Sequence, residues 1–166
     1  MINRTVGLGV LGGVLIAGQV TAQAAISFGN QDYNRSEPVE VTSAQLDVDQ
    51  EAGEAIFQGD VIVGQGTMRL SADRVVVRYS QVSGGGNQID RVLAYGDVTL
   101  VDGTESAEGD DADYSVATGI VIMTGDVILT QGPSVINGDR LRVDLNDGTG
   151  VVEGNVRSIF RQGGDQ

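Results

Sequence analysis

The chain has 166 residues, the length of one domain of ordinary size. Its net charge of −13 argues against a nucleic-acid partner, because such a partner requires a basic surface. The absence of cysteine and histidine excludes thiol and imidazole nucleophiles and soft-metal sites, so we expect no cofactor and no bound metal.

The first 24 residues have the pattern of a secretory signal peptide. Arg4 supplies the positive charge, residues 6–17 form a short apolar stretch, and Ala22-Gln23-Ala24 is a small-x-small cleavage motif. The apolar stretch is too short to span a membrane, and no cysteine follows the motif to carry a lipid anchor. We therefore expect a cleaved signal at 1–24, a mature chain that starts near Ala25, and a flexible polar lead-in at 25–37.

The remainder of the chain has the periodicity of strands. Its apolar residues are mostly Val, Ile and Leu, and only 4% of the chain is aromatic, which favours strands around a thin core. Apolar and polar residues alternate from Val39 and Val41 onwards, with turn signals every few residues and no helical stripe. Leu46 and Val48 are expected to face inward, with Asp47 and Asp49 facing outward.

A short phrase recurs along the chain. It reads Gly59-Asp60-Val61, Gly96-Asp97-Val98, Gly125-Asp126-Val127 and Gly154-Asn155-Val156. Asp73, Asp110 and Asp139 each follow the preceding Gly by 14 residues, and Ala44 holds the same place in the first unit. The period is 29 residues, with 8 extra residues in the second unit, which indicates about four stacked units of roughly two strands each. Each Gly is expected to mark a bend or bulge where the chain changes sheet.

Three polar segments are expected to lie outside the strands. Residues 80–88 contain Gly84-Gly85-Gly86 and hold the insertion, so they are predicted to form a surface loop. Residues 102–111 contain five carboxylates and are predicted to be a solvated turn or loop. Residues 161–166 form a polar tail.

No residue pattern indicates catalysis. The pairs Asp110/Asp111 and Asp47/Asp49 could serve acid–base chemistry or bind Ca²⁺, but acidic residues that recur with a repeat usually stabilise turns. There is no phosphate-binding loop and no nucleophile elbow, so we expect no enzyme. The apolar interior is compatible either with a slot for acyl chains or with a plainly packed sandwich core.

The motifs Pro38-Val39-Glu40-Val41, residues 57–63, residues 65–77 and Met123-Thr124-Gly125-Asp126-Val127 resemble those of the LptA/OstA-like family. The resemblance covers residues 38–160. It implies an all-β fold, a twisted and open β-jellyroll. It also implies a periplasmic bridge that carries lipopolysaccharide by its lipid A acyl chains. Its implied partners are OstA-like domains of an inner-membrane-anchored protein and an outer-membrane receptor, together with further copies of itself, head to tail.

From this resemblance and the inward alternation we predict a lipid-binding groove and two assembly edges. The groove residues are Val39, Leu46, Val61, Val63, Met68, Leu70, Val75, Val77, Val98, Leu100, Tyr114, Val116, Val127, Leu129, Leu141 and Val143. The edge residues are Val39, Val41, Val156, Ile159 and Phe160. The alternatives are another OstA-like domain of the same transport system, a secreted structural β-repeat protein, and a Ca²⁺-dependent secreted enzyme domain.

Overall fold

The computed structural model describes residues 24–28, 34, 36–81 and 84–160, and these residues form eleven strands and no helix. The strands are β1 (Ala24–Ser27), β2 (Glu40–Thr42), β3 (Gln45–Asp49), β4 (Glu54–Gln65), β5 (Met68–Gln81), β6 (Asn87–Asp102), β7 (Glu105–Ser115), β8 (Ile120–Gln131), β9 (Ser134–Asp144), β10 (Thr149–Glu153) and β11 (Arg157–Ile159). The all-β prediction is confirmed, and the first predicted strand corresponds to β2.

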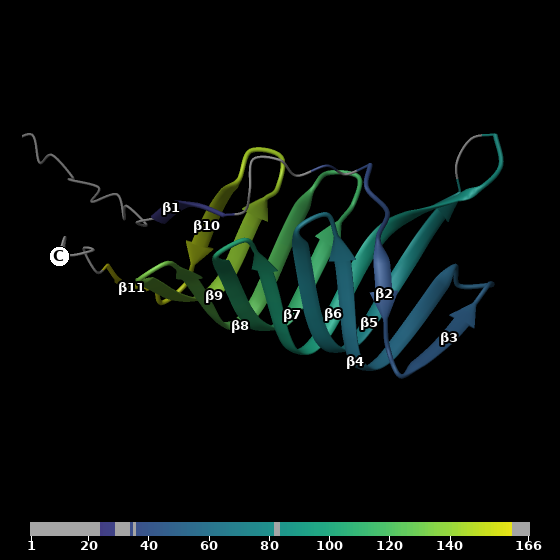
Figure 1. Ribbon diagram of the computed structural model, residues 1–166, viewed down its shortest axis with the longest axis horizontal. Coiled ribbons are helices and arrows are strands. Elements are labelled where there is room, and N and C mark those ends of the chain that lie inside the picture. The colour runs from purple at the N-terminus through teal and green to yellow at the C-terminus, as the bar shows by residue number, and fades with distance from the viewer. Residues whose placement is uncertain (1–23, 29–33, 35, 82–83, 161–166) are drawn as a thin grey trace, which may run out of the picture.

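The strands form one antiparallel sheet in which hairpins follow one another (Figure 1). Its order is β2-β4-β5-β6-β7-β8-β9-β10-β1, while β3 also pairs with β4 and β11 also pairs with β9. Each repeat unit is therefore a hairpin of two strands, and in the first and last units one of the two is divided, into β2 and β3 and into β10 and β11. The insertion lengthens the β5–β6 hairpin, which projects beyond its neighbours in Figure 1.

Each long strand bends at one of two positions. It bends either at a Gly-Asp-Val phrase or at the Asp that lies 14 residues after the Gly of such a phrase. Asp60, Asp97, Asp126 and Asn155 have φ between 43° and 46°, a left-handed conformation that Asp and Asn adopt more readily than most residues. Strand pairing shifts at these bends, for example between Thr124 and Val127 in the β8–β9 pair. The expectation that Gly-Asp-Val marks a bulge is confirmed.

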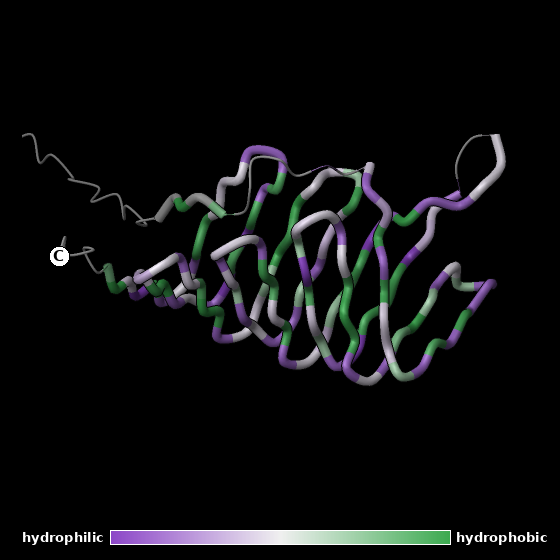
Figure 2. Tube along the Cα trace, viewed as in Figure 1, coloured by the Kyte–Doolittle hydropathy of each residue, from purple (hydrophilic) through white to green (hydrophobic). Residues whose placement is uncertain are grey.

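Because the bends lie side by side, they fold the sheet into two leaves. Leaf A comprises β1, β3, β10 and residues 54–58, 74–81, 87–95, 111–115, 120–124 and 140–144 of the long strands. Leaf B comprises β2, β11 and residues 61–65, 68–72, 98–102, 105–109, 127–131 and 134–138. Apolar residues alternate along both leaves (Figure 2), and their inward members form one buried core between the leaves.

The acidic segment 102–111 differs from its prediction. Asp102 is the last residue of β6, β7 begins at Glu105, and only the two residues between them turn. Glu108, Asp110 and Asp111 are exposed. The strand tolerates them because the outer face of the sheet is in contact with solvent, so a carboxylate there remains hydrated.

The lead-in at 25–37 also differs from its prediction, because it begins with a strand. β1 pairs with β10, and Phe28, the residue after β1, is fully buried in the core. The apolar spacing of Ile26 and Phe28 suits a strand with one buried face. Of the predicted signal peptide only Ala24 lies among the described residues, and the polar tail 161–166 lies outside them.

Candidate lipid groove and assembly edges

The interior of the jellyroll is lined by apolar rows that run across the strands. One row in leaf A joins successive cross-strand partners: Leu46, Phe57, Val75, Ala94, Ala112, Met123, Leu141 and Val152. A second consists of Val48, Ala55, Val77, Val92, Tyr114, Val121, Val143 and Gly150. In leaf B the matching row is Val41, Val63, Leu70, Leu100, Ala107, Leu129, Ile136 and Ser158. The buried apolar lining therefore runs from β4 to β10 in leaf A and from β2 to β9 in leaf B, while Leu46, Val48 and Ser158 at the ends of the rows are exposed.

Most predicted groove residues lie in this interior. The buried ones are Val61, Val63, Met68, Leu70, Val75, Val77, Val98, Leu100, Tyr114, Val127, Leu129, Leu141 and Val143. Val39 and Val116 are partly buried and pack against the core. The prediction omitted further core residues, notably Val92, Val121, Met123, Ile136 and Val152, although the same alternation could have identified them.

Leu46 does not lie in the buried interior, contrary to expectation. Its side chain is 53% exposed, and that of its neighbour Val48 is 64% exposed. Both belong to the inward rows, but β3 pairs only with β4 among the described strands, so no further strand covers them. They form an apolar patch at the open end of leaf A.

A buried hydrogen bond joins the two leaves near the β2 end. Tyr114 in leaf A donates its hydroxyl to Gln65 Oε1 in leaf B over 2.9 Å, and Gln65 Nε2 donates to the backbone oxygen of Glu37 over 2.9 Å. Both side chains are nearly inaccessible to solvent. This hydrogen bond joins the leaves at the side where they lie open to solvent, at the ends of β4 and β7. Separating the leaves there therefore requires breaking it.

A cavity of about 480 Å³ lies beside this bond. Val39 and Gln65 line it from leaf B and the segment before β2, while Ile89 and Val116 line it from the other side. The cavity thus places two predicted groove residues, Val39 and Val116, at the rim where the interior meets solvent. It is large enough to admit part of an acyl chain without displacing the buried core.

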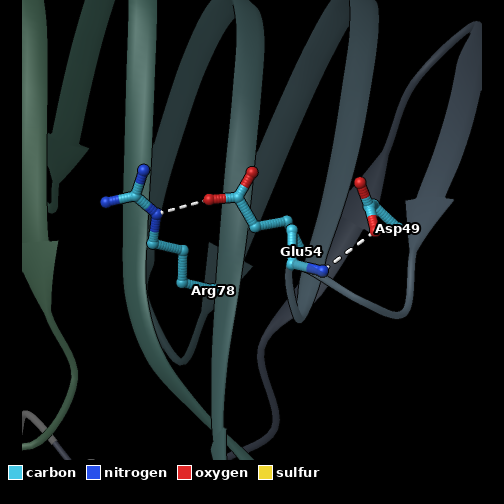
Figure 3. A network of polar contacts seen from close by, with 4 residues as sticks. Asp49, Glu54 and Arg78 are labelled. Carbon is cyan, nitrogen blue, oxygen red and sulfur yellow. Dashed lines mark hydrogen bonds and ion pairs between the residues drawn. The ribbon is translucent and has the colours of Figure 1, made fainter.

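The ion pairs lie on the outer face, while the buried carboxylate of Asp102, at the end of β6, accepts a hydrogen bond from the Thr67 hydroxyl over 2.7 Å. Arg78 contacts Glu54 at 2.7 Å (Figure 3), Arg91 contacts Asp113 at 2.6 Å, and Arg140 contacts Glu153 at 2.8 Å. The hydrogen bond from Arg78 to Glu54 raises the pKa of the Arg78 guanidinium above its ordinary value. Such exposed pairs contribute little to stability. Among the described residues, no cluster of acidic side chains is arranged to hold a metal ion.

The predicted edge residues lie at opposite ends of the sheet. β2, with Val41, and β11, with Ile159, are outer strands of leaf B, and each pairs with one described neighbour. Val39 directly precedes β2, and Val156 and Phe160 flank β11. Val156, Ile159 and Phe160 are 37%, 43% and 71% exposed. The β10 edge in leaf A is not open, because β1 covers it.

Comparison with known proteins identifies the family. A family model described as "LptA/(LptD N-terminal domain) LPS transport protein" matches residues 40–160. An uncharacterised protein of Rhizobium meliloti strain 1021 is 29% identical over 158 residues, covering 92% of this chain and 85% of its own. The lipopolysaccharide export system protein LptA of Escherichia coli K12 is 32% identical over 139 residues, covering 80% and 70%.

A solved structure shares the fold. The crystal structure of LptH from Pseudomonas aeruginosa, described as the LptA-homologous periplasmic component of its lipopolysaccharide transport device, matches with a TM-score of 0.68. The match covers 78% of this chain and 99% of that one at 18% identity, so it shows the shared fold. In the part of the chain that the structure describes, no helix has the length and apolar character needed to cross a membrane. The chain belongs to the LptA/LptD N-terminal domain family of lipopolysaccharide transport proteins.

Proposed function

We propose that this chain is a non-enzymatic periplasmic carrier that binds lipopolysaccharide through its lipid A acyl chains and bridges the inner and outer membranes. The observation that supports the proposal is the apolar lining, which runs without interruption across the long strands β4 to β9 in both leaves. In this proposal residues 1–24 are removed on export. The lipopolysaccharide export role of the Escherichia coli LptA relative supports the same function.

The acyl chains would enter at the rim and be held between the leaves. Each CH₂ removed from water contributes about 0.8 kcal/mol, so a few buried chains would supply substantial affinity. The core residues are tightly buried, which means that the leaves must separate to admit a chain beyond the rim cavity. The bond between Tyr114 and Gln65 then acts as a latch on that separation.

The lipid phosphates would remain outside, where the chain offers little attraction to them. The net charge of −13 opposes anionic head groups, and among the Arg residues that the structure describes Arg78, Arg91 and Arg140 are already paired with carboxylates. Affinity would therefore come mainly from the apolar interior. Because salt screens the repulsion between the acidic chain and the anionic head groups, binding should strengthen rather than weaken as the salt concentration rises.

The bridge would form by head-to-tail stacking of leaves. β2 runs antiparallel to β4, and β11 antiparallel to β9, so β2 of one copy can continue leaf B of another by pairing with β11. The two surfaces differ, so the contact is heterologous and can extend into a filament. Homologous domains anchored at either membrane could dock on the same edges by β-augmentation.

The decisive experiment places a charge at the rim. Val116→Asp introduces a carboxylate beside the cavity at a partly buried position, where the protein should still fold but acyl chains would meet an uncompensated charge. The matched control is Arg69→Asp, an exposed position on the outer side of leaf B. Leu100→Asp is unsuitable because Leu100 is fully buried, so that change should unfold the domain.

Binding of fluorescent lipopolysaccharide to each folded protein provides the measurement. We expect Val116→Asp to weaken binding at least tenfold and Arg69→Asp to leave it within twofold of the parent. Equal binding by all three proteins would place the lipid elsewhere. No binding by the parent protein, combined with concentration-dependent filaments, would instead support a structural β-repeat protein.

A further inference from the structure

The N-terminal strand covers the edge through which the proposed bridge could extend from leaf B into leaf A. β1 pairs with β10 in the register Ala24 to Val152, Ile26 to Gly150 and Ser27 to Thr149. The Phe28 amide then donates to the backbone oxygen of Gly148 over 2.6 Å, and the Phe28 side chain is fully buried. β1 therefore covers the β10 edge of leaf A and seals the core at the end opposite β3.

The repeat fixes how a second copy would pair with this edge. Within the chain, the residue that precedes the Gly of a Gly-Asp-Val phrase faces the residue that follows the repeated Asp on the next strand. Tyr95 faces Asp111 in this way, and Thr124 faces Arg140. Ala44 stands in the Asp position of the first unit, so Glu153 would face Gln45 of the second copy. It follows that Val152 would face Leu46 of the second copy, and Gly150 would face its Val48.

β1 takes the place that this second strand would occupy. β3 and β1 would run in the same direction along β10, because each is antiparallel to a strand of the same orientation. In the proposed mature chain, which starts near Ala25, Ile26 faces Gly150, the residue that Val48 of the second copy would face. The exposed Leu46 and Val48 are the residues that such a contact would bury.

The space left by the missing side chain of Gly150 can hold only one neighbouring side chain. A Cβ built at Gly150 would lie 2.8 Å from Ile26 Cγ1, so the missing side chain leaves room for Ile26. The neighbouring strands carry Val143 and Val121 in this row. One β-branched side chain fits above Gly150, and it comes either from Ile26 of the same chain or from Val48 of a second copy.

We propose that β1 is an intramolecular cap that competes with β3 of a second copy for the β10 edge. The proposal rests on the head-to-tail bridge proposed above. With β1 in place, copies join only through β2 and β11 in leaf B, which are three residues each. When β1 is released, the contact between two copies extends over both leaves. The apolar rows of one copy then continue into those of the next.

Two variants test the cap in the protein exported and processed with its own N-terminal segment. Ile26→Ser with Phe28→Ser removes the two apolar contacts that hold β1 on the core. The matched control is Ile62→Ser, which makes the same kind of change at an exposed position. Ser27→Cys with Thr149→Cys locks the cap, because facing residues of antiparallel strands lie within disulfide reach and the chain has no other cysteine.

Analytical ultracentrifugation over a concentration series measures self-association of the folded proteins. We expect the release variant, Ile26→Ser with Phe28→Ser, to associate at least tenfold more tightly than the parent and the control. A cap that is closed about nine-tenths of the time weakens the apparent affinity between copies about tenfold. The oxidised lock variant should associate more weakly than the parent, and a reducing agent should restore the parental affinity.

The outcomes separate the cap from the bridge. If the parent and the release variant associate measurably and equally, and oxidation of the lock changes nothing, the cap is wrong while the bridge stands. If neither parent nor release variant associates, the head-to-tail bridge is wrong and the cap falls with it. If the release variant fails to fold, the oxidised and reduced lock variant decides alone.

Discussion

The bend at Gly125 is where a single added methyl group should do most damage to the fold. Gly125 has φ +86°, and a Cβ built there would lie 2.6 Å from Asp110 Cβ. A left-handed conformation costs a non-glycine residue about 1–2 kcal/mol. The overlap forces the backbone of the adjacent strand to move, which costs about 1–3 kcal/mol. Gly125→Ala should therefore lower the free energy of unfolding by about 3 kcal/mol.

Thermal unfolding followed by far-ultraviolet circular dichroism measures this loss. For a domain of this size, about 3 kcal/mol corresponds to a fall in Tm of about 10 °C. The matched control is Gly85→Ala, because Gly85 has φ +90° with no atom within 4 Å of the added Cβ. The control should lose only the conformational part, and Asp110→Gly added to Gly125→Ala should recover the steric part. Equal losses for Gly125→Ala and Gly85→Ala would refute a steric role for the bend.

Three further predictions concern the core, the latch and a turn. Met123→Ala, at a fully buried site, should destabilise the domain by about 2–5 kcal/mol in urea unfolding, whereas exposed Ile62→Ala should cost far less. Tyr114→Phe should cost about 1 kcal/mol by the same measurement and speed lipopolysaccharide uptake in stopped-flow fluorescence, because it removes the bond between the leaves; unchanged uptake would contradict the latch. The hydroxyl and amide of Thr149 hold the pKa of Asp147 below its ordinary value, so Thr149→Ala should raise that pKa in an NMR titration. Because the folded-state pKa is the lower one, Asp147 stabilises the parent above its ordinary pKa and loses that contribution as the pH falls through the folded value; an unchanged pKa in the variant would contradict this cause.

The sequence alone determined the all-β fold, most of its strands, the bends and the resemblance to the family. Alternation of period two and the Gly-Asp-Val phrase are local signals, because a strand places every second residue on one face and a left-handed bend selects Gly and Asp whatever lies around it. Residues such as Val75, Leu100 and Leu129 could therefore be assigned to the interior before any contact was known.

Only the tertiary structure decided which strands meet at the ends and across the mouth. Leu46 has the alternation of a core residue but is half exposed, because burial depends on a further strand that the described chain does not place there. Tyr114 and Gln65 are 49 residues apart, and only the folding of one leaf over the other brings them together. Likewise, the spacing of Ile26 and Phe28 is compatible with a strand, but their position beside β10 depends on pairing between distant parts of the chain, which no local pattern specifies.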